Sequence, residues 1–172
     1  TAVFCPDQQT TLGASFWEKT IYDDKKTYNF QFWDTAGQER YRSLCPMYLR
    51  NANIIVMLYE LNNTRNQRAL RNWYKEVVKS YNTESKFIIV GNKKDLDKDV
   101  HIEDIVIDMK NYLKCEHIMT SAKSGYNLDL LFETIFDIGK KVSENMTSKK
   151  SFIDVNLNDK KSESKYRCCT II

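Results

Sequence analysis

The sequence predicts an α/β fold in which a mixed, mostly parallel sheet carries helices on both faces. Two continuous apolar runs, at residues 54–59 and 87–90, are typical of strands that are buried on both sides. Apolar residues recur at helical spacing after each run. This alternation of strand and helix indicates crossover connections, which join parallel strands and place helices over the sheet.

Two strands come first in the chain. Residues 15–22 and 27–33 have the residue pattern of strands, and Asp23-Asp24-Lys25-Lys26 between them supplies a polar turn. The pair therefore predicts an antiparallel hairpin.

Three amphipathic helices follow the hairpin. The first lies between the two apolar runs, the second follows the second run, and the third follows a short strand near Ile118. Their apolar faces are formed by Leu70, Trp73, Val77 and Tyr81, by Ile102, Ile105, Met109 and Tyr112 or Leu113, and by Leu128, Leu131, Phe132, Ile135 and Val142.

The composition changes at about Ser143, beyond which Ser, Lys, Asn and Asp predominate. Such a stretch cannot bury enough apolar surface to offset the entropy lost on ordering. We therefore divide the chain into one globular domain, residues 1–142, and a flexible tail, residues 143–172. The apolar residues at 152–157 predict either a weak strand or a short docking segment for a partner.

Composition also excludes several classes of protein. No apolar run approaches the roughly 18–20 residues that a membrane-spanning helix needs. The net charge is +3 and the pI is about 8.5, below the value of about 9 that is typical of nucleic-acid binders, so no nucleic-acid partner is expected. The 5 cysteines include no CxxC, which argues against a zinc site or a disulfide scaffold and for a reducing compartment.

A Gly-Asn-Lys-Lys-Asp segment, residues 91–95, follows the second apolar run, at the edge where open α/β sheets bind ligands. The Asp95 carboxylate can accept the ring N–H and the exocyclic amine of guanine. The stem of Lys93 can cover the base, and Asn92 can tie neighbouring loops together. Adenine lacks that pair of donors and would leave a buried carboxylate unsatisfied. The alternative is an ordinary polar turn.

The next strand ends in Thr120-Ser121-Ala122-Lys123, which supplies a second loop at the same edge. The backbone N–H of Ala122 can donate to the guanine carbonyl oxygen, and the stem of Lys123 can add to the cover of the base. The alternative is a helix-capping role for Ser121 or Ser124. Two such loops on adjacent strand ends, in this order, favour guanine recognition.

A third loop, Trp-Asp-Thr-Ala-Gly-Gln-Glu, ends the second strand of the hairpin. Asp34 is placed to hold magnesium through water, Gly37 can present its N–H to a terminal phosphate, and Gln38 can orient an attacking water. Thr11 can offer its hydroxyl to the ion, although a Thr before a strand is more often a cap or turn residue. This division of roles is typical of phosphoryl transfer.

The three motifs, in this order, resemble those of Ras-superfamily small GTPases, and within that superfamily the chain is similar to Rab proteins over about residues 9–142. Rab character comes from Gly-Ala-Ser-Phe at 13–16, Trp-Asp at 33–34 followed by Arg-Tyr at 40–41, and Tyr-Leu-Arg at 48–50. The resemblance implies a P-loop NTPase-like fold, GTP or GDP with magnesium as ligands, and hydrolysis with Gln38. It also implies an effector surface at Phe16, Trp33 and Tyr48, for which the alternative is a set of ordinary core aromatics.

The resemblance further implies a switch that regulates vesicle trafficking. Its partners would be a GTPase-activating protein, an exchange factor, effectors, a GDP-dissociation inhibitor, and a Rab escort protein with geranylgeranyl transferase. Cys168 and Cys169 fit double prenylation, and Cys-Thr-Ile-Ile also fits a C-a-a-X box. Two lipid chains give stable anchoring. We expect the cytoplasmic face of an intracellular membrane, most similar to the early endocytic branch, with cycling through the cytosol.

The sequence departs from the family at the phosphate loop G-x-x-x-x-G-K-[ST], which it lacks together with the first strand. That strand is central in the family's sheet, so we expect a gap between the flanking strands with unpaired backbone groups. We also expect that the natural product is longer or that the sequence is a truncated gene model. The alternative function is a non-catalytic Rab-like effector-binding module that keeps the base-reading loops and cannot hold phosphates.

Overall fold

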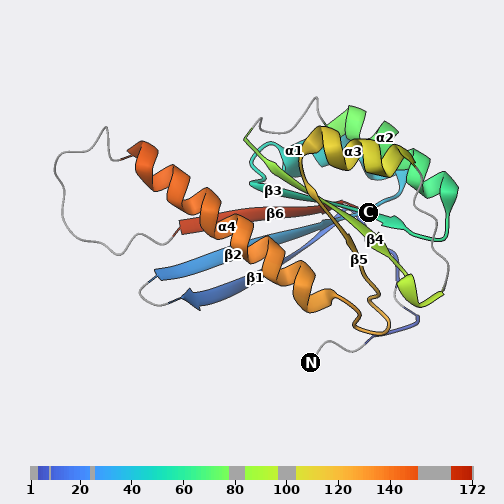
Figure 1. Ribbon diagram of the computed structural model, residues 1–172, viewed down its shortest axis with the longest axis horizontal. Helices are drawn as coiled ribbons and strands as arrows, with labels where there is room; N and C mark the ends of the chain where they lie inside the picture. The colour runs from blue at the N-terminus through green and yellow to red at the C-terminus, as the bar shows by residue number, and fades with distance from the viewer. Residues whose placement is uncertain are drawn as a thin grey trace.

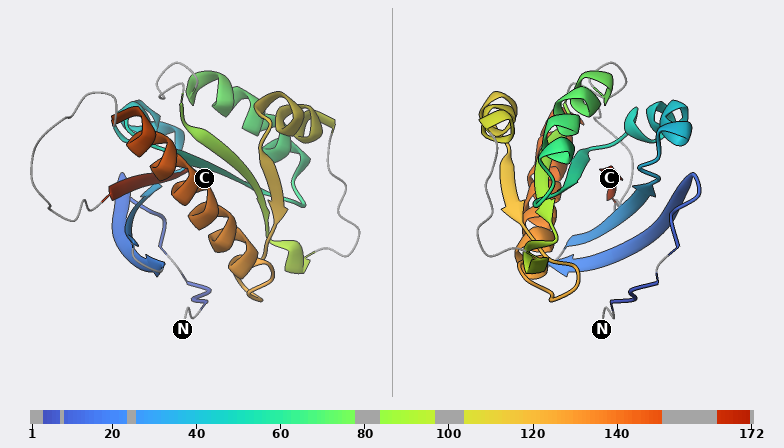
Figure 2. Two further views of the ribbon diagram at one scale, coloured as in Figure 1. Left: turned by 60° about the vertical axis from the view of Figure 1, so that its left-hand side comes forward. Right: turned by 90° about the vertical axis from the view of Figure 1, so that its right-hand side faces the viewer.

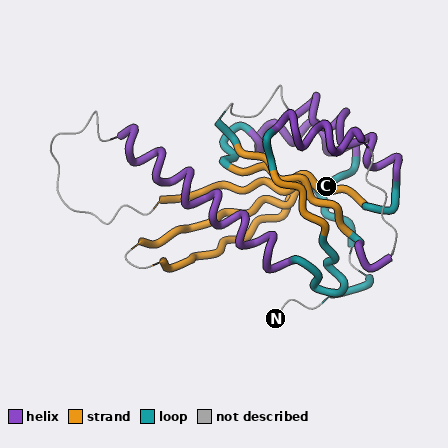
Figure 3. Tube along the Cα trace, viewed as in Figure 1, coloured by secondary structure: helices purple, strands orange, loops and turns teal. Residues whose placement is uncertain are grey.

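The computed structural model describes residues 4–7, 9–23, 26–77, 84–96, 104–150 and 164–171. Six strands form one sheet in the order β1-β2-β6-β3-β4-β5. Figure 3 shows these strands side by side in a single twisted sheet, with the helices outside it. The α/β architecture with a mostly parallel sheet is therefore confirmed.

The hairpin is formed by β1 (Ala14–Asp23) and β2 (Lys26–Thr35), which pair antiparallel from Ala14 opposite Thr35 to Asp23 opposite Lys26. β1 is an edge strand with mostly exposed side chains. Alternate residues of β2 are buried, because one face of this strand lies against a helix. The predicted antiparallel hairpin is confirmed.

The two apolar runs form β3 (Ile54–Glu60) and β4 (Lys86–Asn92), which pair parallel. β5 (Glu116–Met119) adds a third parallel strand beside β4. Successive residues of β3 point into different cores, which is why the run is apolar at consecutive positions. The helices that follow are α2 (Thr64–Val77), α3 (Asp104–Leu113) and α4 (Leu128–Lys150).

The helices cover opposite faces of the sheet. α2 and α3 pack on one face together with a short helix, α1 (Cys45–Leu49), and α4 crosses the other face (Figures 1 and 2). α4 approaches β2 so closely that a Cβ placed on Gly139 would lie 2.4 Å from Cε1 of Phe30. A glycine is therefore needed at this crossing. No helix in the described ranges is long and apolar enough to cross a membrane.

Some predicted elements differ in extent. α1 and the 3-10 helix before it, Glu39–Leu44, are absent from the sequence prediction because neither is long enough to show a helical period. Of the residues predicted on helix faces, Tyr81 and Ile102 lie outside the described residues, as does the apolar segment at 152–157.

The chain beyond Ser143 differs most from its prediction. α4 continues to Lys150, and residues 164–171 form β6 (Ser164–Ile171) between β2 and β3, parallel to both. β6 thus occupies the place in the sheet where a gap was expected. No proline or glycine interrupts 143–150, and β6 contains Tyr, Thr and Ile, which favour strands. The division into a domain of residues 1–142 and a tail stays a prediction.

Candidate functional site

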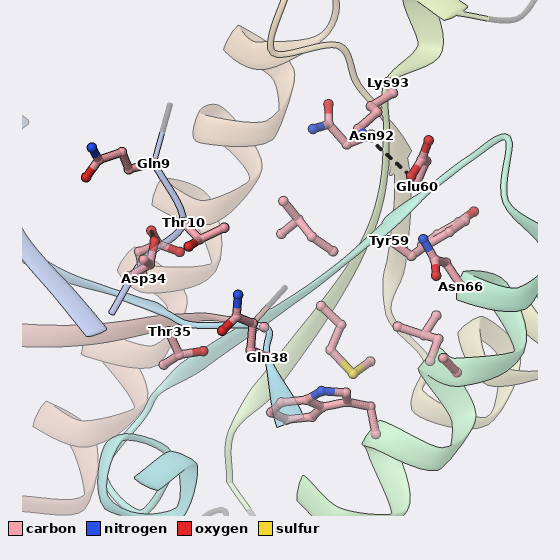
Figure 4. Close-up of a pocket in the computed structure, with 17 residues that line it drawn as sticks. Gln9, Thr10, Asp34, Thr35, Gln38, Tyr59, Glu60, Asn66, Asn92 and Lys93 are labelled. Atoms are coloured by element: carbon pink, nitrogen blue, oxygen red, sulfur yellow. Dashed lines mark hydrogen bonds and ion pairs between the residues drawn. The ribbon is translucent and has the colours of Figure 1, made fainter. Parts of the chain in front are cut away.

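A cavity of about 680 Å³ opens at the carboxyl ends of β2, β3 and β4. It brings together six of the predicted site residues, namely Thr11, Asp34, Gly37, Gln38, Asn92 and Lys93. In Figure 4, Asp34 lies at one side of the cavity, Asn92 and Lys93 lie at the other, and Gln38 lies between them. The volume falls in the range of small-molecule binding sites.

The two predicted base-reading loops are joined through Asn92. Its side-chain oxygen accepts a hydrogen bond from the backbone N–H of Ala122 at 3.1 Å and another from the Thr120 hydroxyl at 3.3 Å. The backbone N–H of Thr120 also donates to the carbonyl of Gly91 at 2.8 Å. Asn92 therefore occupies the Ala122 N–H that the sequence assigns to the guanine carbonyl oxygen, and a bound base would have to share it or displace it.

Asp95 is held by the second loop. The Ser121 hydroxyl donates to Oδ1 of Asp95 at 2.5 Å, and the backbone N–H of Ser124 donates to Oγ of Ser121 at 3.1 Å. The bond from Ser121 is the main cause that lowers the pKa of Asp95, with Lys123 and Lys93 adding smaller contributions. Asp95 is therefore a fixed, ionised acceptor at neutral pH, as recognition of two guanine donors requires.

The backbone around Lys93 is tightly constrained. A Cβ on Gly91 would lie 2.4 Å from Cδ2 of Leu61, so β4 needs a glycine where it passes this side chain. Lys93 has a φ of 67°, in the left-handed region. Its Nζ lies 3.3 Å from Oε2 of Glu60 (Figure 4). Both side chains are partly exposed, so this ion pair orients Lys93 more than it stabilises the fold.

Asp34 carries the features of a cation ligand. Its Oδ2 accepts hydrogen bonds from the hydroxyls of Thr11 at 3.2 Å and Ser15 at 3.4 Å. Its Oδ1 is buried with no hydrogen-bond partner among the described residues, and burial raises the pKa of this carboxyl. A bound cation would satisfy that oxygen.

These oxygen donors fit magnesium. The ion is bound through one or two protein oxygens, with water and phosphate completing its shell. Asp34 and the Thr11 hydroxyl supply that number. No group of three His, Cys, Asp or Glu side chains suited to a metal occurs in the described ranges, so a cage made wholly of protein ligands is absent there.

Gly37 and Gln38 lie in the loop that follows β2, and both line the cavity. Gly37 is exposed, and its N–H carries no side chain that would block a ligand. The carbonyl of Gln38 accepts the N–H of Tyr41 at 3.0 Å, which fixes the loop to the start of the 3-10 helix. Gln38 therefore lines the cavity from a loop that is anchored at its carboxyl end.

The three predicted effector residues form a contiguous aromatic row outside this cavity. The ring centroids of Phe16 and Trp33 are 4.8 Å apart, and those of Trp33 and Tyr48 are 5.2 Å apart. Phe16 is 47% exposed, whereas Trp33 and Tyr48 also pack against the core beneath α1 to α3. The row therefore has one exposed end, as an effector surface would have. Its other two residues pack against the core, as ordinary core aromatics do.

Several residues of the site are missing from the sequence prediction. Gln9, Thr10, Tyr59, Glu60, Asn66 and Trp73 also line the cavity. Glu60 ends a buried strand at the same sheet edge as Asn92, a signal that marks it as a candidate. Asn66 and Trp73 come from α2 and carry no comparable signal, because their approach depends on how that helix packs. The two predicted lipidation sites, Cys168 and Cys169, lie in β6.

An open α/β sheet with two loops linked through Asn92 at one edge, and with Asp34 bonded to Thr11 beside them, fits the small-GTPase class. Comparison with protein-family models matches residues 1–141 to the Ras family, and the chain therefore belongs to that family. Members of the Ras family are guanine-nucleotide switches that bind GTP and GDP with magnesium and interact with activating, exchange and effector proteins. The resemblance seen in the sequence is thus confirmed at the level of the superfamily.

Proposed function

We propose that the chain is a Rab-type switch that binds GTP and GDP and regulates intracellular vesicle trafficking. The observation that supports guanine recognition is the fixed carboxylate of Asp95, bonded to Ser121 and placed beside a loop that lines the cavity. A base that lacks two adjacent donors would not satisfy the acceptor positions of this carboxylate that Ser121 leaves open, so it should bind more weakly than guanine.

The cavity residues support a hydrolytic role. Gln38 would orient water, and the Gly37 N–H would contact the terminal phosphate. The oxygen of water would bond to the terminal phosphorus while the bond to the bridging oxygen breaks, so that GDP leaves with the electron pair and the proton passes to phosphate. Thr11 and Asp34 would hold magnesium, which when bound neutralises charge on the phosphates.

The Rab assignment adds partners and a location. The row of Phe16, Trp33 and Tyr48 would be read by effectors. Cys168 and Cys169 would carry geranylgeranyl groups after delivery by an escort protein. Each thiol sulfur would bond to C1 of a prenyl diphosphate, and diphosphate would leave as the thiol proton is lost. The product would cycle between the cytosol and an endosomal membrane through a GDP-dissociation inhibitor.

Nucleotide selectivity tests this proposal. The Asp95→Asn variant replaces an acceptor by a group that can donate, so it should lose affinity for a fluorescent GDP analogue and gain affinity for the xanthine analogue, which has a carbonyl where guanine has an amine. Asp129→Asn, an acid in the first turn of α4, is the matched control. Equal affinity of the wild-type chain and Asp95→Asn for both nucleotides would contradict guanine recognition by Asp95.

A second candidate is the non-catalytic effector-binding module. It is favoured by β6, whose residue Ile171 pairs with Thr35 and Met57, both of which line the cavity. This module would fail to retain labelled GTP in magnesium, although its aromatic row would still bind a partner. Retention of GTP, with turnover that falls in Gln38→Leu, would instead favour the switch.

A further inference from the structure

Helix α2 presents a row of basic side chains to solvent. Arg65, Arg68, Arg71 and Lys75 are all exposed, whereas Leu70 on the other side of the helix is buried. The four basic residues are spaced three, three and four positions apart, which places them on one side of a helix with 3.6 residues per turn. They form a stripe about 15 Å long, which we call the α2 basic face.

The α2 basic face keeps an excess of positive charge. By sequence the helix contains these four basic residues and one acid, Glu76. Within the described ranges, the side chains of Arg65, Arg71 and Lys75 form no ion pair. The neighbouring helix α3 and the residue after it expose two acids and two bases, so their charges balance; these are Asp104, Asp108, Lys110 and Lys114.

The same face exposes no large apolar side chain among the described residues of α2. Stable interfaces between proteins are centred on buried aromatic or aliphatic anchors, and charged residues are depleted from their centres. An anionic lipid surface needs no such anchor, because each Lys or Arg near it raises the affinity about 5-fold through its charge. The composition of this face therefore favours a lipid surface over an acidic protein.

We propose that the α2 basic face is a membrane-contact surface that binds the anionic headgroups of a bilayer. Three of its four residues are arginine, whose guanidinium N–H groups donate in pairs to the oxygens of a phosphate or carboxylate. Such lipids carry these groups across a plane. A straight row of cations on the outside of a helix matches a plane better than it matches a pocket.

Contact through α2 would also orient the rest of the molecule. α4 covers the opposite face of the sheet from α2, so it would point away from the bilayer (Figures 1 and 2). Asn66 and Trp73, which line the cavity, belong to the same helix as the basic face, so the cavity would lie near the bilayer. A basic face and a lipid chain together give stable anchoring. The charge of α2 does not itself rest on the prenylation proposed above.

Vesicle binding of the full chain without prenyl groups tests the proposal. Cosedimentation is measured with vesicles of phosphatidylcholine alone and with vesicles of equal parts phosphatidylcholine and phosphatidylserine. We expect binding to the second composition only, and we expect it to weaken as sodium chloride is added, because salt screens exposed charges. Equal binding to both compositions, or binding that salt leaves unchanged, would overturn an electrostatic contact.

A pair of double variants assigns the binding to α2. Arg71→Gln/Lys75→Gln removes two charges from the face, and glutamine keeps the helix propensity, which circular dichroism checks. Lys19→Gln/Lys141→Gln removes the same charge from exposed residues of β1 and α4 and is the matched control. The α2 variant should bind anionic vesicles about 30-fold more weakly than the wild type, and the control should retain most of the affinity. An equal loss in both would show that net charge alone governs binding, against the proposal.

Amine acetylation followed by peptide mass spectrometry shows which side of the protein faces the bilayer. On anionic vesicles Lys75 should react more slowly than in the free chain, whereas Lys141 should react at its free rate. Protection of Lys141 with Lys75 still reactive would place α4 on the bilayer and refute the assignment to α2.

The other occupant of such a face is an acidic protein, for which immobilised polyglutamate serves as the probe. If Arg71→Gln/Lys75→Gln weakens binding to polyglutamate and leaves vesicle binding unchanged, the lipid surface is the wrong partner. None of these measurements needs nucleotide, so their failure would leave the test of Asp95→Asn unaffected.

Discussion

Replacing Gly139, where α4 crosses β2, should change the stability of the fold through two opposing effects: overpacking of the core and a gain in helix propensity. A Cβ on Gly139 would meet Cε1 of Phe30 at 2.4 Å and Cζ at 2.6 Å. Phe30 is 0% exposed and its ring also packs edge-on against Phe136, with centroids 4.9 Å apart, so it cannot move aside cheaply. Gly139→Ala should therefore overpack the core, although alanine is the better helix former.

The sizes of these two effects decide whether Gly139→Ala raises or lowers the free energy of unfolding. Overpacking a core costs about 1–3 kcal/mol, and replacing glycine by alanine inside a helix returns about 1 kcal/mol. Gly139→Ala should lower the free energy of unfolding by up to about 2 kcal/mol, which corresponds to a fall in Tm of about 4–8 °C for a chain of this size. Urea denaturation followed by circular dichroism measures this difference.

A second variant tests the cause. Phe30→Leu removes the ring atoms that the new Cβ would meet. On its own this change is destabilising, but in its presence Gly139→Ala should become neutral or stabilising by up to about 1 kcal/mol, because only helix propensity then remains. If Gly139→Ala costs the same in both backgrounds, the contact with Phe30 is not the reason for the glycine. A stabilised single variant would refute the overpacking altogether.

Two predictions concern titratable groups. Burial raises the pKa of the Asp34 carboxyl, so the folded state loses stability as the pH rises and this group ionises. Asp34→Asn should therefore raise Tm at neutral pH without magnesium. The same variant should abolish any rise in Tm that magnesium produces. A rise in Tm with magnesium that persists in Asp34→Asn would contradict the cation site. Burial, with a smaller contribution from Lys110, lowers the pKa of His117, whose Nε2 lies 2.9 Å from the Tyr59 hydroxyl. The stability due to neutral His117 is complete above its unfolded pKa of about 6.5 and is lost as the pH falls. His117→Gln should therefore reduce the dependence of the free energy of unfolding on pH below about 6.5. If the variant shows the same dependence as the wild type, His117 is not the cause of the loss of stability in acid.

The sequence predicts most of the elements because their signals are local. The apolar runs at 54–59 and 87–90 mark strands that are buried on both faces, and the hairpin follows from its own polar turn. The motif loops converge because parallel strands bring their carboxyl ends to one edge. Each of these inferences needs only a few neighbouring residues and one general rule.

The placement of β6 cannot be predicted in the same way. Its residues are polar and apolar in no regular period, and composition alone favours a flexible tail. They form a strand by pairing with β2 and β3, which lie far away in the sequence. The hydrogen bond of Asn92 to the Ala122 N–H is likewise a tertiary contact that a motif does not reveal.

β6 also links the two halves of the site. Asn92 ends β4 and Asp95 follows it, and β4 is supported by β3 and β5 through direct pairing. Asp34 and Gln38 belong to the hairpin side, and the backbone ladder that joins this hairpin to β3 runs through β6. Tyr166→Pro removes a backbone N–H inside β6, so it should loosen the hairpin side while leaving β4 paired with β3 and β5. Hydrogen exchange would show this as faster exchange in β2 than in β4, and equal acceleration in both strands would show that the sheet opens as one unit.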